Sequence, residues 1–216
     1  MNFNEHSNLR GKHAAFSPST YQWLQDNPDQ AIRRYCAGFA SSVGTILHGL
    51  AEDYIKFGMK MTRFDKKQVT LCLLKAGIPT LVIDRLPIDD IFDNLMNYVN
   101  DAVGFRMKPE VVLYYSDIFF GTTDAISFDE KEKMLRVHDL KTGVSPAKID
   151  QLMIYEALFC LEYGSILHFR PEEIQSELRI YQGGDIDFCI PERDDVIMVM
   201  EHIKMLDDMM RHCERR

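Results

Sequence analysis

The middle of the chain changes from helical to strand-type patterning, and this change constrains the fold more than any other feature. Residues 88–104 (IDDIFDNLMNYVNDAVG) repeat apolar side chains at helical spacing. The next runs, PEVVLYYSDIFFGTTDAISFD and MLRVHDLKTG, are rich in β-branched and aromatic residues. The polar run DEKEK lies between them and is typical of a turn. We therefore expect three strands between residues 110 and 141, with an antiparallel pair joined by this turn.

Helical patterns lie on both sides of these strands. A short helix is expected to be capped by Ser17 or Ser19 and to stop near Asn27-Pro28. A longer helix is expected over 31–58, with an interruption by small residues at 41–44. The other expected elements are helices at 65–78, 88–104, 148–164 and 191–216, and a hairpin of strands at 177–182 and 185–191 around Gly183-Gly184.

This order of elements predicts an α/β or α+β sandwich in which helices cover a sheet. The chain has 216 residues, of which 46% are hydrophobic, and no Pro/Gly/Ser-rich linker divides it. That is enough apolar material for one sizeable core. We expect a single domain over 1–216, with a helical part at about 17–104 and the sheet with its remaining helices at about 105–216.

Two expected strands carry acids and a lysine. Asp139 and Lys141 are two residues apart, so their side chains project from the same face of a strand. Asp124 lies on the preceding strand, and antiparallel pairing can bring it beside Asp139. Two adjacent carboxylates repel each other unless a cation lies between them, and a hard divalent ion is the usual solution. A lysine beside that ion can orient or deprotonate water, so the set predicts metal-assisted phosphodiester hydrolysis by a nuclease.

The helix before the strands offers a further ligand. His48 lies in GTILHGLAED, where a helix can present an imidazole beside carboxylates from strands. A single helical histidine is more often structural or exposed, so His48 depends on that setting. Glu52 follows one turn later and either orients His48 or is a solvated acid.

Polar residues after Lys141 complete the candidate site. Gln151 and Tyr155 share a helix face and can bind a phosphate or the catalytic lysine, although such a pair is ordinarily a solvated face. Thr142 permits a tight exit from the strand, and Lys148 lies near the start of the next helix, where a phosphate is favoured. Glu110 begins the first strand and is either a further metal-site acid or a strand-edge charge.

Composition narrows the class of protein. The net charge is −8, which counts against a protein that coats DNA non-specifically. The polar N-terminus has no secretory pattern, and no apolar run approaches the roughly 20 residues of a membrane span. The five cysteines lie far apart without CxxC spacing. We therefore expect a cytoplasmic protein with free thiols.

The ordered motifs GTxxHxxxE, GxxDxI, DxKTG and QxxxY resemble those of the RecB-like branch of the PD-(D/E)XK nuclease superfamily, including phage-type exonucleases. The match covers roughly residues 40–160. The residues that carry it are Gly44-Thr45, His48, Glu52, Gly121, Asp124, Ile126, Asp139-Leu140-Lys141-Thr142-Gly143, Gln151 and Tyr155.

The resemblance implies an α/β fold with a central mixed β-sheet flanked by helices, the restriction-endonuclease-like core. It implies a Mg²⁺ or Mn²⁺ site formed by His48, Asp124, Asp139 and the Leu140 carbonyl, with Glu110 where some relatives have an extra acid. Lys141 would position the attacking water or stabilise charge, and Gln151 and Tyr155 would hold the lysine or the DNA backbone. The implied activity is DNA hydrolysis at ends during phage-type recombination or repair, in the cytoplasm of a bacterium or an infected host, with a recombinase or single-strand-binding protein as candidate partner.

The chain departs from some relatives that hold an iron–sulfur cluster. The order of Cys36, Cys160, Cys189 and Cys213 imitates theirs, but the last three are more than twenty residues apart, which argues against convergent thiolates. Two alternatives stay open. One is a nuclease-like fold used as a non-catalytic binding or regulatory module for a nucleoprotein partner. The other is a metal-free network in which Lys141 neutralises one acid.

Overall fold

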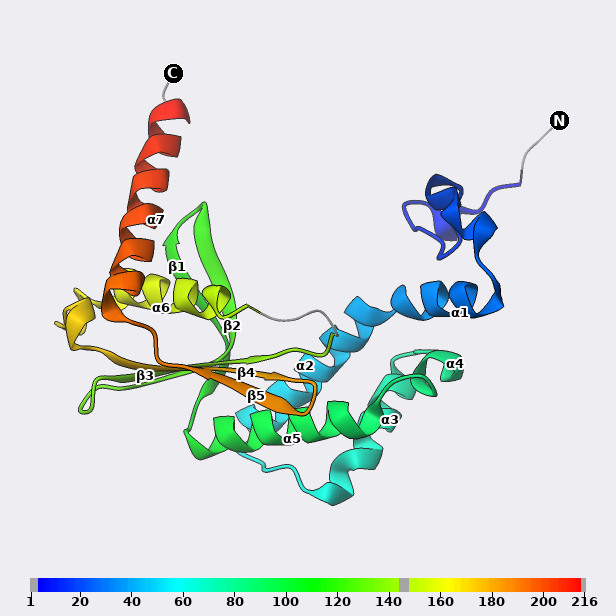
Figure 1. Ribbon diagram of the computed structural model, residues 1–216, viewed down its shortest axis with the longest axis horizontal. Coiled ribbons are helices and arrows are strands. Elements are labelled where there is room, and N and C mark those ends of the chain that lie inside the picture. Colours follow the sequence, from blue (N-terminus) through cyan, green and yellow to red (C-terminus); the bar gives the residue numbers. More distant parts are fainter. Residues whose placement is uncertain (1–3, 144–147, 215–216) are drawn as a thin grey trace.

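The computed structural model describes residues 4–143 and 148–214 and has an α/β architecture (Figure 1). Its centre is a mixed sheet of five strands in the order β1-β2-β3-β4-β5, antiparallel except that β3 and β4 run parallel. The expected three-strand run and the later hairpin are therefore confirmed. The strands are β1 (Lys108–Ser116), β2 (Phe119–Asp129), β3 (Met134–Leu140), β4 (Gln175–Gln182) and β5 (Asp185–Cys189).

Helices flank the sheet, as the sequence predicts. Helix α5 precedes the β1–β2–β3 meander, and α6 forms the crossover from β3 to the parallel strand β4. The α-helices are α1 (Pro28–Ala37), α2 (Ala40–Lys56), α3 (Lys66–Lys75), α4 (Thr80–Ile83), α5 (Ile88–Gly104), α6 (Asp150–Tyr163) and α7 (Arg193–Glu214). The short 3₁₀ helices are η1 (Ser7–Leu9), η2 (Pro18–Gln25), η3 (Arg63–Asp65) and η4 (Pro171–Glu173).

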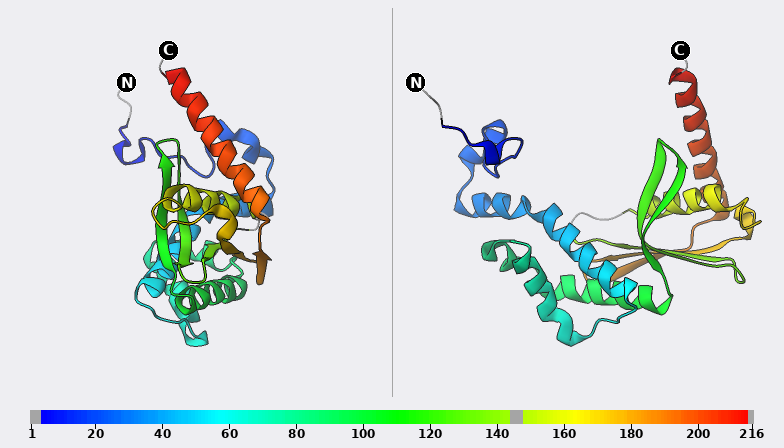
Figure 2. Two further views of the ribbon diagram at one scale, coloured as in Figure 1. Left: turned by 90° about the vertical axis from the view of Figure 1, so that its left-hand side faces the viewer. Right: turned by 180° about the vertical axis from the view of Figure 1, so that it is seen from behind.

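Two apolar cores lie on opposite faces of the sheet (Figures 1 and 2). Helices α2 and α5 cover one face, where Leu47, Leu95 and Leu140 are almost fully buried, and α3 packs against these two helices. Helix α6 covers the other face, where its Leu152 and Val137 of β3 are buried in one apolar cluster, and α7 packs against α6. Because neighbouring residues of β3 point to opposite faces, Asp139 faces α6, whereas His138 and Leu140 face α5.

Two helix boundaries differ from the sequence-based expectation. The helix expected from residue 31 begins at Pro28, because Asn27 accepts a hydrogen bond from Gln30 N and caps it. The interruption predicted at 41–44 is wrong: α1 stops at Gly38, and α2 runs through 41–44 without a break. The small residue Gly44 instead permits close approach, since an added Cβ would lie 3.1 Å from Thr142 Oγ1.

The N-terminal part extends away from this body. Figure 1 shows residues 4–25 beyond the far end of α1, on the side opposite α7. Ser17 caps η2 through a bond from Ser19 N, as expected for the short first helix. Within the described residues, no helix is both long enough and apolar enough to cross a membrane.

Candidate metal centre

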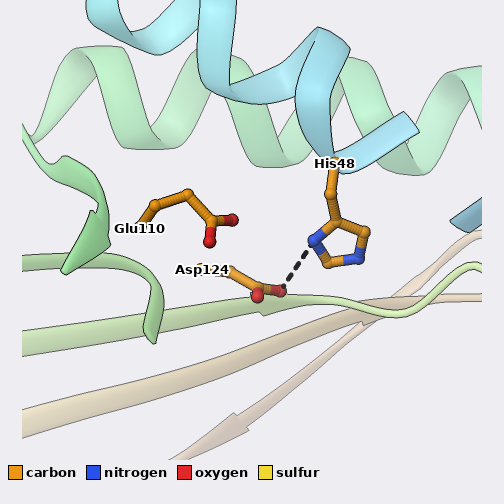
Figure 3. Close-up of side chains that lie close together, drawn as sticks. All are labelled: His48, Glu110 and Asp124. Carbon is orange, nitrogen blue, oxygen red and sulfur yellow. Dashed lines mark ion pairs between the residues drawn. The ribbon is translucent and has the colours of Figure 1, made fainter. Parts of the chain in front are cut away.

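The candidate centre lies where α2 crosses the strands β1 and β2. His48 Nδ1 is 3.5 Å from Asp124 Oδ2 (Figure 3). The same carboxylate oxygen accepts a hydrogen bond of 2.8 Å from Leu140 N, which fixes the β2 acid against the end of β3. A histidine from a helix and a carboxylate from a strand, 76 residues apart in sequence, thus meet at one point.

Glu110 completes this group. The pairs Pro109–Ala125 and Val111–Thr123 place it across from Asp124 in the β1–β2 ladder. Figure 3 shows its carboxylate pointing toward the space between Asp124 and His48. One ligand atom from each of Glu110, Asp124 and His48 lies within 4.8 Å of the others.

The backbone of Glu110 has φ +52°, in the left-handed region that costs a non-glycine residue about 1–3 kcal/mol. Strain of this kind is retained where surrounding structure holds a side chain in place for a purpose. The residue lines a pocket of about 510 Å³ together with Gly44, Thr45, His48, Gly49, Glu52 and Asp124.

Asp139 and Lys141 lie beside this group on β3 and its exit. Lys141 Nζ is 2.9 Å from Asp139 Oδ2 and donates to Oδ1 at 3.1 Å. It also donates to Gln151 Oε1 at 3.2 Å, and Gln151 Nε2 donates to Tyr155 OH at 3.2 Å. A chain of contacts from α6 therefore fixes the position of the lysine ammonium.

A glycine on β2 makes room for that chain. A Cβ added at Gly121 would lie 2.9 Å from Tyr155 Cε1, closer than real Cβ contacts. The glycine three residues before Asp124 thus allows the Tyr155 ring to lie directly on β2. Gly121 belongs to the GxxDxI motif, and the structure identifies the Tyr155 ring as the group that lies against it.

The carboxylates repel one another. Burial, reinforced by the negative charge of Asp124, raises the pKa of Asp139, and the Lys141 ammonium only partly opposes this. Burial followed by the charge of Asp124 also raises the pKa of Glu110. The hydrogen bond with Asp124 raises the pKa of His48, despite an opposing effect of burial. Burial is the main cause for the two acids and the bond with Asp124 is the main cause for His48, and the charge of Asp124 contributes to all three shifts.

The residues present fit a hard divalent ion. Carboxylate oxygens with one imidazole suit Mg²⁺ or Mn²⁺. Asp139 is nearly fully buried, and Lys141 Nζ lies 2.9 Å from its Oδ2. One ammonium does not neutralise several neighbouring acids, which leaves negative charge for a divalent ion.

The structure brings some of the predicted site residues into one compact group and leaves others outside it. The compact group contains His48, Asp124 and Glu110, whose role the sequence leaves open, whereas the Asp139 carboxylate lies outside it. The Leu140 peptide contacts the site through its N–H, and its predicted carbonyl ligand stays a prediction. The sequence marks Glu110 as a candidate acid but does not predict its left-handed backbone, because glutamate is not favoured in that region.

The outer candidates lie at the margins. Glu52 lines the pocket, and its carboxylate pairs with Lys56, a partner that i,i+4 spacing indicates. Thr142 lies against Gly44. Lys148 is exposed before α6, and its contact with substrate stays a prediction.

The cysteines expected to be free thiols are unpaired in the structure. They occupy separate elements: Cys36 on α1, Cys72 on α3, Cys160 on α6, Cys189 on β5 and Cys213 on α7. Comparisons of the chain with protein-family models, curated proteins and solved structures found no match.

Proposed function

We propose that the protein is a Mg²⁺- or Mn²⁺-dependent deoxyribonuclease, an exonuclease that hydrolyses phosphodiester bonds at DNA ends in phage-type recombination or repair. The observation that carries the proposal is the meeting of His48, Glu110 and Asp124 beside the Asp139–Lys141 pair. Excess carboxylates, an imidazole and one oriented lysine are the parts that metal-assisted phosphodiester hydrolysis requires.

The restriction-endonuclease-like core is part of this proposal. Its support is the general architecture, a mixed sheet flanked by helices, in which helix α5, the β1–β2–β3 meander, the α6 crossover and the parallel strand β4 follow one another along the chain. The acids lie on adjacent strands of that meander, and the lysine lies where β3 ends.

His48, Glu110, Asp124 and Asp139 would hold the ion. When bound, the ion polarises the phosphoryl oxygen and lowers the pKa of water. Lys141 orients the attacking water and places positive charge near the phosphate as negative charge develops. Gln151 maintains the lysine in that position through its 3.2 Å contact, and Tyr155 maintains Gln151.

The test compares the wild-type chain with Asp139→Ala on linear, nicked circular and single-stranded DNA labelled separately at each end. Mg²⁺, Mn²⁺ and EDTA are supplied in parallel. We expect metal-dependent loss of linear DNA with the wild type alone, and the label released first gives the polarity. Full activity in a clean Asp139→Ala preparation would sink the proposal.

The second candidate is a non-catalytic binding module for a nucleoprotein partner such as a recombinase or single-strand-binding protein. Its support is the net charge of −8, which disfavours broad electrostatic binding of DNA. Calorimetric titration with Mn²⁺ separates the candidates, because a disused site has no physical reason to bind one ion at the three-residue group. Absence of metal binding together with absence of cleavage would favour the module.

A further inference from the structure

The N-terminal segment, residues 4–25, leaves its apolar side chains uncovered. Phe16 and Trp23 contact each other edge to face at 5.9 Å, and Trp23 Nε1 donates to Ser17 O at 2.9 Å. None of the residues 4–25 is buried. The exposed fractions of its large apolar side chains are 55% for Leu9, 38% for Phe16, 65% for Tyr21 and 70% for Leu24.

Such a segment requires a cover. About twenty residues with few internal contacts do not bury enough apolar surface to offset the loss of chain entropy. Figures 1 and 2 place it far from the sheet and from α6 and α7, so its own body does not cover it. Its exposed apolar side chains are therefore available for contact with another molecule.

The opposite end of the molecule carries an apolar groove of matching character. It has a volume of about 790 Å³ and lies between the start of β2, α6 and α7. Its exposed apolar side chains are those of Ile154 on α6 and of Met198 and Met205 on α7, the last two more than half exposed. Methionine side chains adapt to the shape of a partner, and an exposed apolar patch of this kind marks an interaction site.

Charge also matches between the two surfaces. Asp150 and Glu201 line the groove, whereas Arg10 and Lys12 are exposed on the segment beside Leu9. Basic side chains at the rim of an apolar contact would meet acids at the rim of the groove. A stable interface buries roughly 800 Å² on each partner, and fully burying an aromatic side chain supplies roughly 150–250 Å². The four side chains are 38–70% exposed, so their burial would supply part of that area.

We propose that the groove formed by α6, α7 and the start of β2 binds the N-terminal segment of a second copy of this chain. The two surfaces differ and lie at opposite ends of the molecule, so the contact is head-to-tail and each copy offers both halves. The inference is independent of nuclease activity, because neither surface includes the candidate metal centre.

Sedimentation velocity on the full chain tests the proposal, with Leu24→Glu altering the segment and Met205→Glu altering the groove. Both positions are exposed, and far-UV circular dichroism confirms that each variant folds. We expect the wild type to self-associate and each variant to weaken this on the order of 100-fold, because a charge enters an apolar contact. Phe64→Glu, at a 93% exposed residue outside both surfaces, should associate like the wild type.

Mixing the two variants gives the decisive measurement. Leu24→Glu retains an intact groove and Met205→Glu an intact segment, so an equimolar mixture should form a dimer and nothing larger. A mixture that stays monomeric overturns the proposal, as does a wild type that is monomeric at about 100 μM. Two other results also overturn the proposal. If Leu24→Glu associates normally, the groove binds the groove of a second copy. If the wild type is monomeric and only Leu24→Glu loses DNA binding, the segment binds DNA.

Discussion

Two of the carboxylates that are buried beside a cation differ in their surroundings. Asp139 on β3 lies 2.9 Å from Lys141 Nζ, and Glu156 on α6 lies 2.5 Å from Arg193. Burial raises the pKa of both carboxyl groups. By composition and burial alone, the pairs are equivalent.

The two ion pairs differ in the residues that surround them. Arg193 also donates to Ser176 Oγ at 2.6 Å and to the Pro191 carbonyl at 3.0 Å, so its guanidinium connects α6, β4 and the start of α7. Asp139 instead faces a second acid, Asp124, that opposes its ionisation. An acid neutralised by its own arginine joins elements together, whereas an acid beside another acid leaves charge for a cation. Surplus charge, not burial, distinguishes a candidate site from a structural ion pair.

Removal of the lysine should have the largest effect on activity. We expect Lys141→Ala to lower the cleavage rate by roughly 10²–10⁴-fold, since an oriented proton-transfer or charge-stabilising group contributes that much. The unfolding free energy should also fall, because the buried Asp139 loses its cation beside Asp124. Single-turnover cleavage and chemical denaturation measure the two quantities. An active Lys141→Ala would make the two ion pairs alike.

Removal of the arginine should lower stability without changing activity. Arg193→Met leaves Glu156 buried without its cation, which costs about 3–5 kcal/mol of unfolding free energy. Cleavage per folded molecule should be unchanged, because Arg193 does not touch the candidate metal centre. Arg170→Met is the matched control: its pair with Glu173 is solvent-exposed and contributes less than about 1 kcal/mol. Equal losses in the two variants, measured by denaturation, would remove the structural role of Arg193.

Added metal should raise the unfolding free energy by binding beside Asp124 and Asp139, and not at the Glu156–Arg193 pair. At one hundred times its Kd, Mn²⁺ should raise the unfolding free energy of the wild type by about 2.7 kcal/mol. Asp124→Asn should abolish this gain, whereas Arg193→Met should retain it on a lower baseline. Thermal unfolding with and without Mn²⁺ measures the difference. A gain that survives in Asp124→Asn would place the ion elsewhere.

Much of this arrangement is predictable from sequence because it follows from local periodicity. Alternation in β3 places Asp139 and Lys141 on one face, and helical spacing places Gln151 beside Tyr155. The contact from Lys141 Nζ to Gln151 Oε1 is consistent with those two periodicities. Short-range patterns therefore predict which residues share a face.

Long-range details are not predictable in this way. The left-handed backbone of Glu110 depends on its position opposite Asp124, which no neighbouring residue in the sequence dictates. The small residues near Gly44 suggest a helix break, yet they permit contact with Thr142 across nearly one hundred positions of chain. Both features depend on tertiary contacts that a pattern of residue types does not contain.

His138 is buried on the other face of β3. Burial and the charges of Arg179 and Arg136 lower its pKa from 6.5 to about 3. Between these two pKa values His138 is protonated in the unfolded chain but neutral in the folded chain. The unfolding free energy therefore falls as the pH falls below about 6.5, by about 2 kcal/mol at pH 5. Denaturation across pH 5–7 should show a smaller slope for His138→Asn. The exposed His13→Asn should keep the wild-type slope, and an equal slope in both variants would contradict the assignment.

The smallest expected effect concerns the backbone strain at Glu110, which can be measured separately from metal binding. Glycine adopts positive φ freely, so Glu110→Gly should relieve backbone strain and reduce repulsion with Asp124, which raises the metal-free unfolding free energy by about 1 kcal/mol. His168 has φ +56° outside the site, and His168→Gly should give the strain part alone. Only Glu110→Gly should weaken Mn²⁺ binding in calorimetry. If metal affinity is the same in both variants, the strain at Glu110 has no connection with the centre, and the surplus charge belongs to Asp124 and Asp139 alone.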